Sequence, residues 1–422
     1  MELLWQERAS NWEGIFLMNT KYVVLLADGM SDYPVPELNN NTPLQCAFKP
    51  NMDKLASKSI VGLAKTIPEG LPPASDVANL SVMGYDPKKY YTGRSPLEAV
   101  SMGIEMAESD LSLRCNLVTL SEDEKYDKKM MLDHSSDEIS SEEASKLMES
   151  ISSCFNRQDI KFYSGVSYRH LMVWNKDNAD LILEPPHDIL GRQISDYLPQ
   201  GNDSKVLLDM MVKSYNLLSD HPVNTKRKER GLKPANSIWL WGQGKKPHLP
   251  QFFDKFKKTG SVIAAVDLIK GIGLCAGLTS VNVHGATGNI HTDFEGKADA
   301  ALKELDSGKD FVYIHVEAPD ECGHRYEIDN KVKSIELIDK LVLGRILAGI
   351  RKYDNYKILI LPDHPTPLSL RTHTEDPVPF ILYDHAKEKN SFVDSYNELE
   401  AKKSGIFIDE GYKLLNMLFN SM

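Results

Sequence analysis

Three strongly apolar runs in this chain lead into carboxylate and imidazole side chains. The runs are Tyr22–Ala27, Phe311–Val316 and Tyr356–Pro362. The polar residues that follow them are Asp28, Asp320 and the pair Asp363-His364. A continuous aliphatic run is typical of a parallel strand buried on both faces, and ligands of open α/β sheets bind just beyond the carboxyl ends of such strands. The sequence therefore predicts an α/β fold with a polar site at the ends of three strands.

Two further histidines, His324 and His373, follow closely on these strand ends. Taken singly, an Asp-Gly pair such as Asp28-Gly29 is typical of a turn. A lone histidine near a strand end is usually a structural residue whose ring is hydrogen-bonded. Three carboxylates and three histidines at three strand ends are not explained in this way. Because carboxylate and imidazole bind divalent metals such as zinc and manganese, the pattern predicts a site for two metal ions.

The composition argues against several other classes of protein. The chain has 422 residues, of which 41% are hydrophobic and 26% are charged, and its net charge is -11. Its one basic cluster, residues 226–230, is short and interrupted, so we expect no nucleic-acid partner. No apolar stretch reaches the ~20 residues that a membrane helix needs, so we expect no membrane partner either.

The five cysteines are scattered and include no Cys-x-x-Cys pair, which argues against a disulfide framework and favours a cytoplasmic location. Cys322 lies in the loop of the predicted metal site, and we interpret it as a space-filling residue rather than a ligand.

The segment before Met18 lacks the basic-then-apolar order of a signal peptide. Trp12-Glu13-Gly14 can be encoded by a purine-rich ribosome-binding sequence, and Met18 leads directly into the first strand. We therefore interpret residues 1–18 as a non-native or disordered extension, with the true start at Met18.

The secondary-structure pattern divides the chain into a core and an insertion. Residues 19–111 are typical of an α/β domain, and the same pattern resumes over residues 236–422. Between them, residues 112–235 alternate strand-like pieces with helices, one of which opens at Ser140 with a capping-type sequence. We predict that residues 112–235 form an inserted α+β substrate domain that acts as a lid.

Ser75 lies between a proline turn and a stretch that can begin a helix. A serine at such a place is usually an N-cap. The alternative is a nucleophile, because the N–H groups of a helix N-terminus favour a phosphoryl anion and a metal ion can lower the pKa of a hydroxyl.

Nine stretches of the chain resemble motifs of one enzyme family. They are Ala27–Met30, Thr42–Leu44, Pro50–Ala56, Gly84–Pro87, Tyr90–Arg94, Ile238–Gly244, Gly285–Gly288, His315–His324 and Pro362–Pro367. In this order they are similar to the archaeal-type branch of the cofactor-independent phosphoglycerate mutases, within the alkaline phosphatase superfamily. The resemblance spans about residues 19–420. It implies a three-layer α/β core with a mostly parallel sheet, interrupted by a substrate domain.

The resemblance also implies the ligands and the chemistry. The implied ligands are Asp320, His324 and His373 for one ion, and Asp28, Ser75, Asp363 and His364 for the other. Ser75 would carry a phosphoserine intermediate in the interconversion of 2- and 3-phosphoglycerate, without bisphosphoglycerate. Manganese is the expected metal, with zinc and cobalt as alternatives.

A small phosphorylated acid as substrate calls for cations close to it. The candidate substrate-binding residues are Arg94, Arg114, Asp133, Arg169 and Lys297. Arginine pairs bidentately with carboxylate or phosphate, although Arg94 and Arg114 are equally compatible with salt bridges. We interpret His284, His291 and His315 as structural residues.

One stretch departs from the family pattern. Asp137-Glu138 stand where family members often carry basic or histidine residues. Two carboxylates would repel a phosphoglycerate and suit an amino group better. This leaves open a homoserine-kinase-like phosphotransferase or a phosphatase on the same scaffold, although the sequence has no Gly-x-x-x-x-Gly-Lys-Ser/Thr loop. A non-catalytic metal-binding protein is a third alternative.

Overall fold

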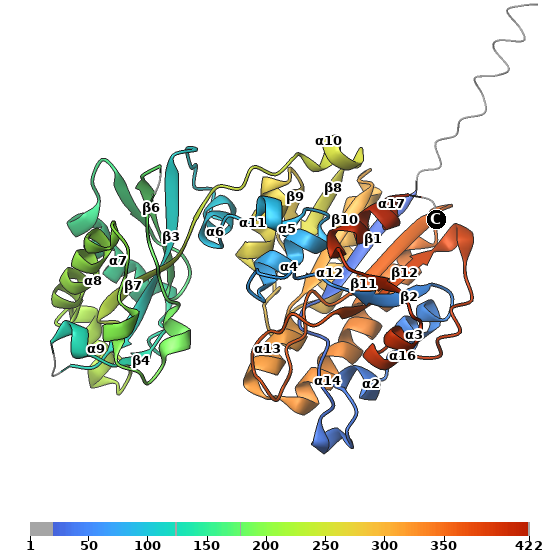
Figure 1. Ribbon diagram of the computed structural model, residues 1–422, viewed down its shortest axis with the longest axis horizontal. Coiled ribbons are helices and arrows are strands. Elements are labelled where there is room, and N and C mark those ends of the chain that lie inside the picture. The colour runs from blue at the N-terminus through green and yellow to red at the C-terminus, as the bar shows by residue number, and fades with distance from the viewer. Residues whose placement is uncertain (1–19, 123–124, 178, 421–422) are drawn as a thin grey trace, which may run out of the picture. The chain divides into compact units, whose positions relative to one another are not determined.

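A computed structural model describes residues 20–122, 125–177 and 179–420 of the chain (Figure 1). The expectations about residues 1–18 therefore lie outside the described residues. The chain divides into two compact units. Unit 1 comprises the residues up to Lys89 and those from Pro250 onward, and unit 2 comprises Tyr90–Leu249.

Unit 1 is built on one eight-stranded sheet with the strand order β13-β2-β12-β11-β1-β10-β8-β9. Its strands are β1 (Lys21–Ala27), β2 (Ile60–Ala64), β8 (Gly260–Ile263), β9 (Thr279–Val281), β10 (Phe311–Val316), β11 (Tyr356–Leu361), β12 (Val378–Asp384) and β13 (Phe407–Ile408). The strands from β11 to β9 run parallel, whereas β12 is antiparallel to both of its neighbours. This arrangement confirms the mostly parallel α/β core.

Helices connect the strands of this sheet and pack on both of its faces (Figure 1). The α-helices are α2 (Pro43–Cys46), α3 (Pro50–Ala56), α4 (Ser75–Val82), α5 (Pro87–Tyr90), α10 (Phe252–Phe256), α11 (Asp267–Cys275), α12 (Phe294–Asp306), α13 (Ala318–Arg325), α14 (Ile328–Leu337), α15 (Gly344–Ile350), α16 (Glu398–Lys403) and α17 (Leu414–Phe419). Shorter 3₁₀ or π segments are η1 (Pro36–Leu38), η5 (Ile338–Leu343), η6 (His385–Lys387) and η7 (Gly411–Lys413).

The central strand β1 is buried on both faces, which explains its unbroken apolar sequence. Val23 and Leu25 belong to the core that the sheet forms with α12 and α14. Side chains alternate along a strand, so Tyr22 and Val24 face the other side. There the ring of Tyr22 packs against Phe419 of α17, with the ring centroids 4.9 Å apart.

Strand β1 lies between β10 and β11, and its register brings the carboxyl ends of all three strands level. Ala27 pairs with Val316 of β10, and Leu26 pairs with Leu361 of β11. The residues that follow these strands therefore leave the sheet at one edge.

Unit 2 contains a five-stranded antiparallel sheet in the order β4-β3-β6-β5, with β7 also paired to β3. The strands are β3 (Asp110–Leu120), β4 (Met131–Asp133), β5 (Ile160–Tyr163), β6 (Arg169–Asn175) and β7 (Ser237–Lys245). The helices are α6 (Ser95–Ser101), α7 (Ser141–Phe155), α8 (Ser204–Leu218) and α9 (Pro222–Glu229), with short η2 (Tyr126–Lys128), η3 (Pro186–Ile189) and η4 (Ile194–Tyr197). Figure 1 shows α7 and α8 against one face of this sheet.

The borders of unit 2 lie outside the segment 112–235 expected from the sequence. Helix α6 packs on β3 and β7, so the unit begins earlier. Strand β7 pairs with β3 from Leu111 to Val118, so the unit ends later. The apolar sequence of β7 thus forms a strand of unit 2 and not of the core. Within the described ranges, no helix has both the length and the apolar character needed to cross a membrane.

Candidate active site

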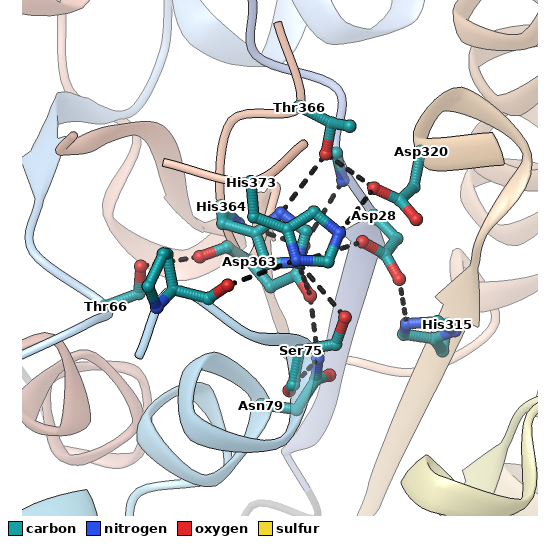
Figure 2. Close-up of polar contacts among 12 residues, drawn as sticks. Asp28, Thr66, Ser75, Asn79, His315, Asp320, Asp363, His364, Thr366 and His373 are labelled. Carbon is teal, nitrogen blue, oxygen red and sulfur yellow. Dashed lines mark hydrogen bonds and ion pairs between the residues drawn. The ribbon is translucent and has the colours of Figure 1, made fainter. Parts of the chain in front are cut away.

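The predicted metal ligands lie together at one edge of the unit 1 sheet. Figure 2 labels Asp28, Ser75, Asp320, Asp363, His364 and His373 among them. The ligands are Asp28 after β1, Asp320 and His324 in α13, Asp363 and His364 after β11, and His373 in the loop before β12. Ser75, the first residue of α4, joins them through a contact of 3.1 Å between its Oγ and Nε2 of His364. These side chains form two adjacent clusters.

The first cluster consists of Asp320, His324 and His373. One carboxylate oxygen of Asp320 lies 3.3 Å from Nε2 of His324, and the other lies 3.3 Å from Nε2 of His373. The two Nε2 atoms are 2.9 Å apart. Asp320 and His324 face the same way because they are four residues apart on α13. Three ligand groups thus converge on one point.

The hydrogen bond at Nδ1 of each imidazole determines whether its Nε2 atom can bind a cation. Nδ1 of His324 lies 2.9 Å from the carbonyl oxygen of Arg371, and Nδ1 of His373 lies 3.2 Å from that of Pro73. A carbonyl oxygen only accepts, so each Nδ1 carries a proton. The lone pairs of both Nε2 atoms then face each other and the carboxylate. A cation between them relieves this repulsion, and metal-bound histidines share this pattern of outer hydrogen bonds.

In the metal-free protein a proton can occupy the same position. Burial opposes a charge on His324, but Asp320 outweighs it and raises the pKa of His324 to about 9. Burial likewise opposes ionisation of Asp320, yet hydrogen bonds from His324 and His373 hold the pKa of Asp320 well below its usual range. The first cluster therefore fits a divalent ion that enters in exchange for a proton.

The second cluster surrounds Nε2 of His364. This atom lies 3.1 Å from Ser75 Oγ, 3.4 Å from Asp363 Oδ2 and 3.6 Å from Asp28 Oδ1. Ligands at about 2.1 Å from a tetrahedral ion are about 3.4 Å from one another, so this spacing fits one metal ion. Burial lowers the pKa of His364 to about 4, which keeps the imidazole neutral and able to ligate.

The surroundings of Asp28 disfavour its ionised form unless a cation lies close to it. Burial and the neighbouring carboxylate of Asp363 raise the pKa of Asp28 well above its usual range. Its Oδ1 is buried and has no hydrogen-bond partner among the described residues. Buried polar atoms are nearly always partnered in folded proteins, so an open oxygen here is the expected state of a metal ligand.

Asp363 is oriented by residues that were not predicted from the sequence. Its Oδ2 accepts a hydrogen bond of 2.8 Å from Asn79 Nδ2, and its Oδ1 accepts one of 3.2 Å from the N–H of Gly29. The hydroxyl of Tyr313 in turn donates to Asn79 Oδ1 at 2.6 Å. Asn79 lies four residues after Ser75 in α4, so helical spacing was the signal that could have identified it.

His315 and Lys297 lie next to Asp28. Nε2 of His315 is 3.0 Å from Asp28 Oδ2, although neither ring nitrogen makes a hydrogen bond with a described residue. Burial lowers the pKa of His315 to about 3, so the ring is neutral. Lys297 is fully buried, and its ammonium donates to the carbonyl of His315 at 3.0 Å. Substrate binding by Lys297 stays a prediction.

Three other residues of the sequence analysis lie apart from the two clusters. His284 and His291 are exposed. Cys322 is buried, and burial raises the pKa of its thiol to about 12, so it is a neutral thiol at physiological pH.

Unit 2 gathers the three predicted arginines near Glu98 of α6. Nε of Arg94 and Nε of Arg114 lie 3.2 and 3.0 Å from the two carboxylate oxygens of Glu98. Burial opposes ionisation of Glu98, but Arg114, Arg94 and Arg169 together lower its pKa. The guanidinium of Arg114 stacks on Trp241, 4.4 Å from the ring centroid. Three cations with one carboxylate leave a net positive charge that suits an anion.

Asp133 and Asp137 share a lysine that balances their charge. Asp133 accepts hydrogen bonds of 2.8 Å from both the N–H and the hydroxyl of Ser135, and one of 2.7 Å from Lys233 Nζ. The same Nζ lies 3.2 Å from Asp137 Oδ1. Glu138 is exposed. The repulsion that this acidic stretch was expected to exert is therefore reduced within unit 2. Substrate binding by Asp133 stays a prediction.

The sequence is similar to that of curated phosphoglycerate mutases over nearly its whole length. A probable 2,3-bisphosphoglycerate-independent phosphoglycerate mutase of Geobacter sulfurreducens is 49% identical, with 95% of this chain and 100% of that protein covered. The 2,3-bisphosphoglycerate-independent phosphoglycerate mutase of Methanothrix thermoacetophila is 48% identical, with 94% and 99% covered.

The chain is also similar to solved structures and matches a family model. A protein of Pyrococcus horikoshii superposes with a TM-score of 0.78 at 28% identity, covering 96% of this chain and 98% of that one. The cofactor-independent phosphoglycerate mutase of Thermoplasma acidophilum superposes with a TM-score of 0.61 at 26% identity, covering 94% and 98%. The model of the 2,3-bisphosphoglycerate-independent phosphoglycerate mutase family matches residues 56–224. Together with the two metal-ligand clusters, these similarities confirm the resemblance seen in the motifs: the chain belongs to the 2,3-bisphosphoglycerate-independent phosphoglycerate mutase family.

Proposed function

We propose that this protein interconverts 2-phosphoglycerate and 3-phosphoglycerate through a phosphoserine at Ser75, using two divalent metal ions and no bisphosphoglycerate. The observation that carries the proposal is the position of Ser75. Its Oγ lies 3.1 Å from Nε2 of His364, within a cluster of metal ligands and at the first residue of α4. A serine that serves only as an N-cap would not need these neighbours.

Each cluster would hold one ion. Asp320, His324 and His373 would bind the first, and Asp28, Asp363, His364 and Ser75 would bind the second. Bound ions would favour the ionised form of Ser75 and neutralise the charge that builds up on a transferring phosphoryl group. Mixed carboxylate and imidazole ligands suit Mn²⁺, with Zn²⁺ and Co²⁺ as alternatives.

In this proposal Ser75 acts as the nucleophile. Its Oγ would form a bond to phosphorus as the bond from phosphorus to the substrate oxygen breaks. The glycerate hydroxyl released in this step takes up a proton. After the glycerate turns, its other hydroxyl loses a proton and attacks the phosphoserine, which frees Ser75. The reaction consumes no water, so a site that admitted water would act as a phosphatase.

The arginines near Glu98 are the proposed site for the acidic part of the substrate. Arg94 and Arg114 are held by Glu98, and Arg114 also by Trp241, so their guanidinium groups lose little freedom on binding. Arg169 is exposed at the start of β6 and adds a third cation.

Asp133 and Asp137 pair with Lys233, so their charge is already balanced and they are less suited to bind the amino group of a substrate. We also propose a cytoplasmic location, in keeping with five scattered cysteines that include no Cys-x-x-Cys pair.

An assay of the purified, Mn²⁺-loaded protein tests this function. With 3-phosphoglycerate and no bisphosphoglycerate, we expect 2-phosphoglycerate to form with little inorganic phosphate. Two parallel reactions address the alternatives, one with ATP and homoserine and one with a simple phosphate ester. Phosphorylation of homoserine without any mutase activity would support the kinase alternative instead.

A further inference from the structure

Thr366 is a fully buried residue two positions after His364, and its hydroxyl contacts both metal-ligand clusters (Figure 2). Its Oγ1 lies 2.5 Å from Oδ1 of Asp320 and 3.3 Å from Nδ1 of His364. Asp320 belongs to the first cluster and His364 to the second. One hydroxyl therefore serves a ligand of each predicted ion.

The direction of the two hydrogen bonds follows from the protons available. A carboxylate oxygen only accepts, so the single hydroxyl proton of Thr366 goes to Asp320. Oγ1 can then only accept from His364, which places a proton on Nδ1 of that ring. This leaves Nε2 of His364 unprotonated, facing Ser75 and the carboxylates of the second cluster. The hydroxyl of Thr366 thus selects the tautomer of His364 that can ligate through Nε2.

The surrounding structure fixes the position of this hydroxyl. The buried ammonium of Lys331 donates to the carbonyl of Thr366 at 2.7 Å and to Asp32 at 2.7 Å. The N–H of Thr366 donates to the carbonyl of Ser31 at 3.2 Å. Gly29 leaves room for the side chain, since a Cβ at that position would lie 2.5 Å from Oγ1 of Thr366. The threonine is therefore held by its backbone on one side and by two metal ligands on the other.

We propose that Thr366 is a positioning residue that prepares both metal sites at once. It holds one carboxylate oxygen of Asp320 and the metal-binding tautomer of His364. The inference rests on the proposed metal dependence and adds a residue that orients the ligands without touching the ions. Such outer residues typically change metal affinity by about 10- to 100-fold. Because the hydroxyl contacts a residue of each cluster, its loss should weaken the binding of metal ions to both clusters.

Isothermal titration of metal-free protein with Mn²⁺ tests the proposal. Thr366→Val keeps the shape of the side chain but removes the hydroxyl, and it should weaken both binding events by about 10- to 100-fold. Thr366→Ser restores the hydroxyl and should recover most of the affinity. Thr366→Ala also removes the hydroxyl but leaves a smaller side chain, and it should weaken Mn²⁺ binding as much as Thr366→Val does. The result therefore does not depend on how well valine fits.

Thr42→Val is the matched control. Thr42 is also buried in unit 1, and its hydroxyl donates to the carboxylate of Glu398 at 2.8 Å, outside both clusters. This variant should lose some thermal stability and bind Mn²⁺ like the wild type. Wild-type affinity in Thr366→Val and Thr366→Ala, weakening of one binding event only, or equal weakening in Thr42→Val would each overturn the shared role. A wild-type protein that bound no Mn²⁺ would contradict the proposed metal dependence, and this inference with it.

Discussion

Nε2 of His324 lies 2.9 Å from Nε2 of His373, while the Nδ1 atom of each ring faces a backbone carbonyl. Two facing Nε2 lone pairs at this distance repel each other unless a metal ion or a proton lies between them. This arrangement is built from an i, i+4 pair on α13 and a loop residue some distance along the chain.

Removal of divalent metal should abolish the interconversion of phosphoglycerates, and Mn²⁺ should restore it. Mn²⁺ should also raise the melting temperature, because an ion that binds only the folded chain adds about 2.7 kcal/mol per site at a hundredfold excess over its Kd. The measurements are a coupled mutase assay and thermal denaturation after dialysis against a chelator, with Zn²⁺ and Co²⁺ in parallel. Full activity in protein shown to contain no metal would refute the metal requirement.

The affinity of the first cluster for metal should rise with pH. Asp320 raises the pKa of His324 to about 9 against the opposing effect of burial, so a metal ion must displace a proton at neutral pH. Affinity should therefore increase by up to about tenfold per pH unit from about 6.5 to about 9. The stability of the metal-free protein should change in the opposite sense. A raised pKa in the folded state stabilises below the unfolded value of about 6.5, and this contribution is lost as the pH rises through 9.

Titration calorimetry of Ser75→Ala with Mn²⁺ checks this pH dependence without the serine proton. The number of protons released is obtained by repeating the titration in buffers of different ionisation enthalpy, and we expect at least one at pH 7.5, from His324. His364 should contribute none, because burial lowers its pKa to about 4. Binding that weakens between pH 7 and 9, or that releases no proton, would show that His324 does not ligate.

The strands, and the carboxylate and imidazole side chains that follow them, could be predicted because both depend on local sequence. β1, β10 and β11 are buried on both faces, so their sequences are unbroken aliphatic runs. Parallel strands end at the same edge, which is why Asp28 and Asp363 could be expected to meet. His364 directly follows Asp363, and its N–H donates to Asp363 Oδ1 at 2.9 Å, so their proximity is local.

Helical spacing places Asn79 on the same face of α4 as Ser75, but the carboxylates that Asn79 and Thr366 contact could not be predicted, because they are remote in sequence. Asn79 reaches Asp363 across 284 positions, and Thr366 reaches Asp320 across 46. Nothing in the local sequence shows which hydroxyl or amide will face a carboxylate. The pairing of Asp133 with Lys233, 100 positions away, was missed for the same reason.

Arg169→Ala should slow the mutase reaction more than the hydrolysis of a simple phosphate ester. Only the mutase must hold a free glycerate while it turns, so a cation for the acid group matters more there. The two rates are measured on the same preparation. Arg157→Ala is the control, because Arg157 is an exposed arginine of unit 2 that pairs only with the nearby Asp159 among the described residues. An equal loss of both activities in Arg169→Ala would assign Arg169 a general structural role.

Ser75→Ala should lose several powers of ten in turnover while keeping its fold, because it deletes a single oxygen from the nucleophile. Circular dichroism and thermal denaturation of the metal-free protein check the fold. Ser81→Ala is the control within the same helix, since Ser81 is buried and its hydroxyl has no hydrogen-bond partner among the described residues. It should retain activity. Turnover in Ser75→Ala close to that of the wild type would exclude a covalent role for Ser75.

Trapping of the phosphorylated enzyme shows directly whether Ser75 carries the phosphoryl group during the reaction. Mn²⁺-loaded wild-type protein is mixed with 3-phosphoglycerate, quenched in acid within the first turnover, and mapped by peptide mass spectrometry. We predict a phosphoryl group on Ser75 that is absent from Ser75→Ala and decays as 2-phosphoglycerate forms. Formation of 2-phosphoglycerate with no phosphoserine at any time, or with the phosphoryl group on another residue, would rule out Ser75 as the nucleophile.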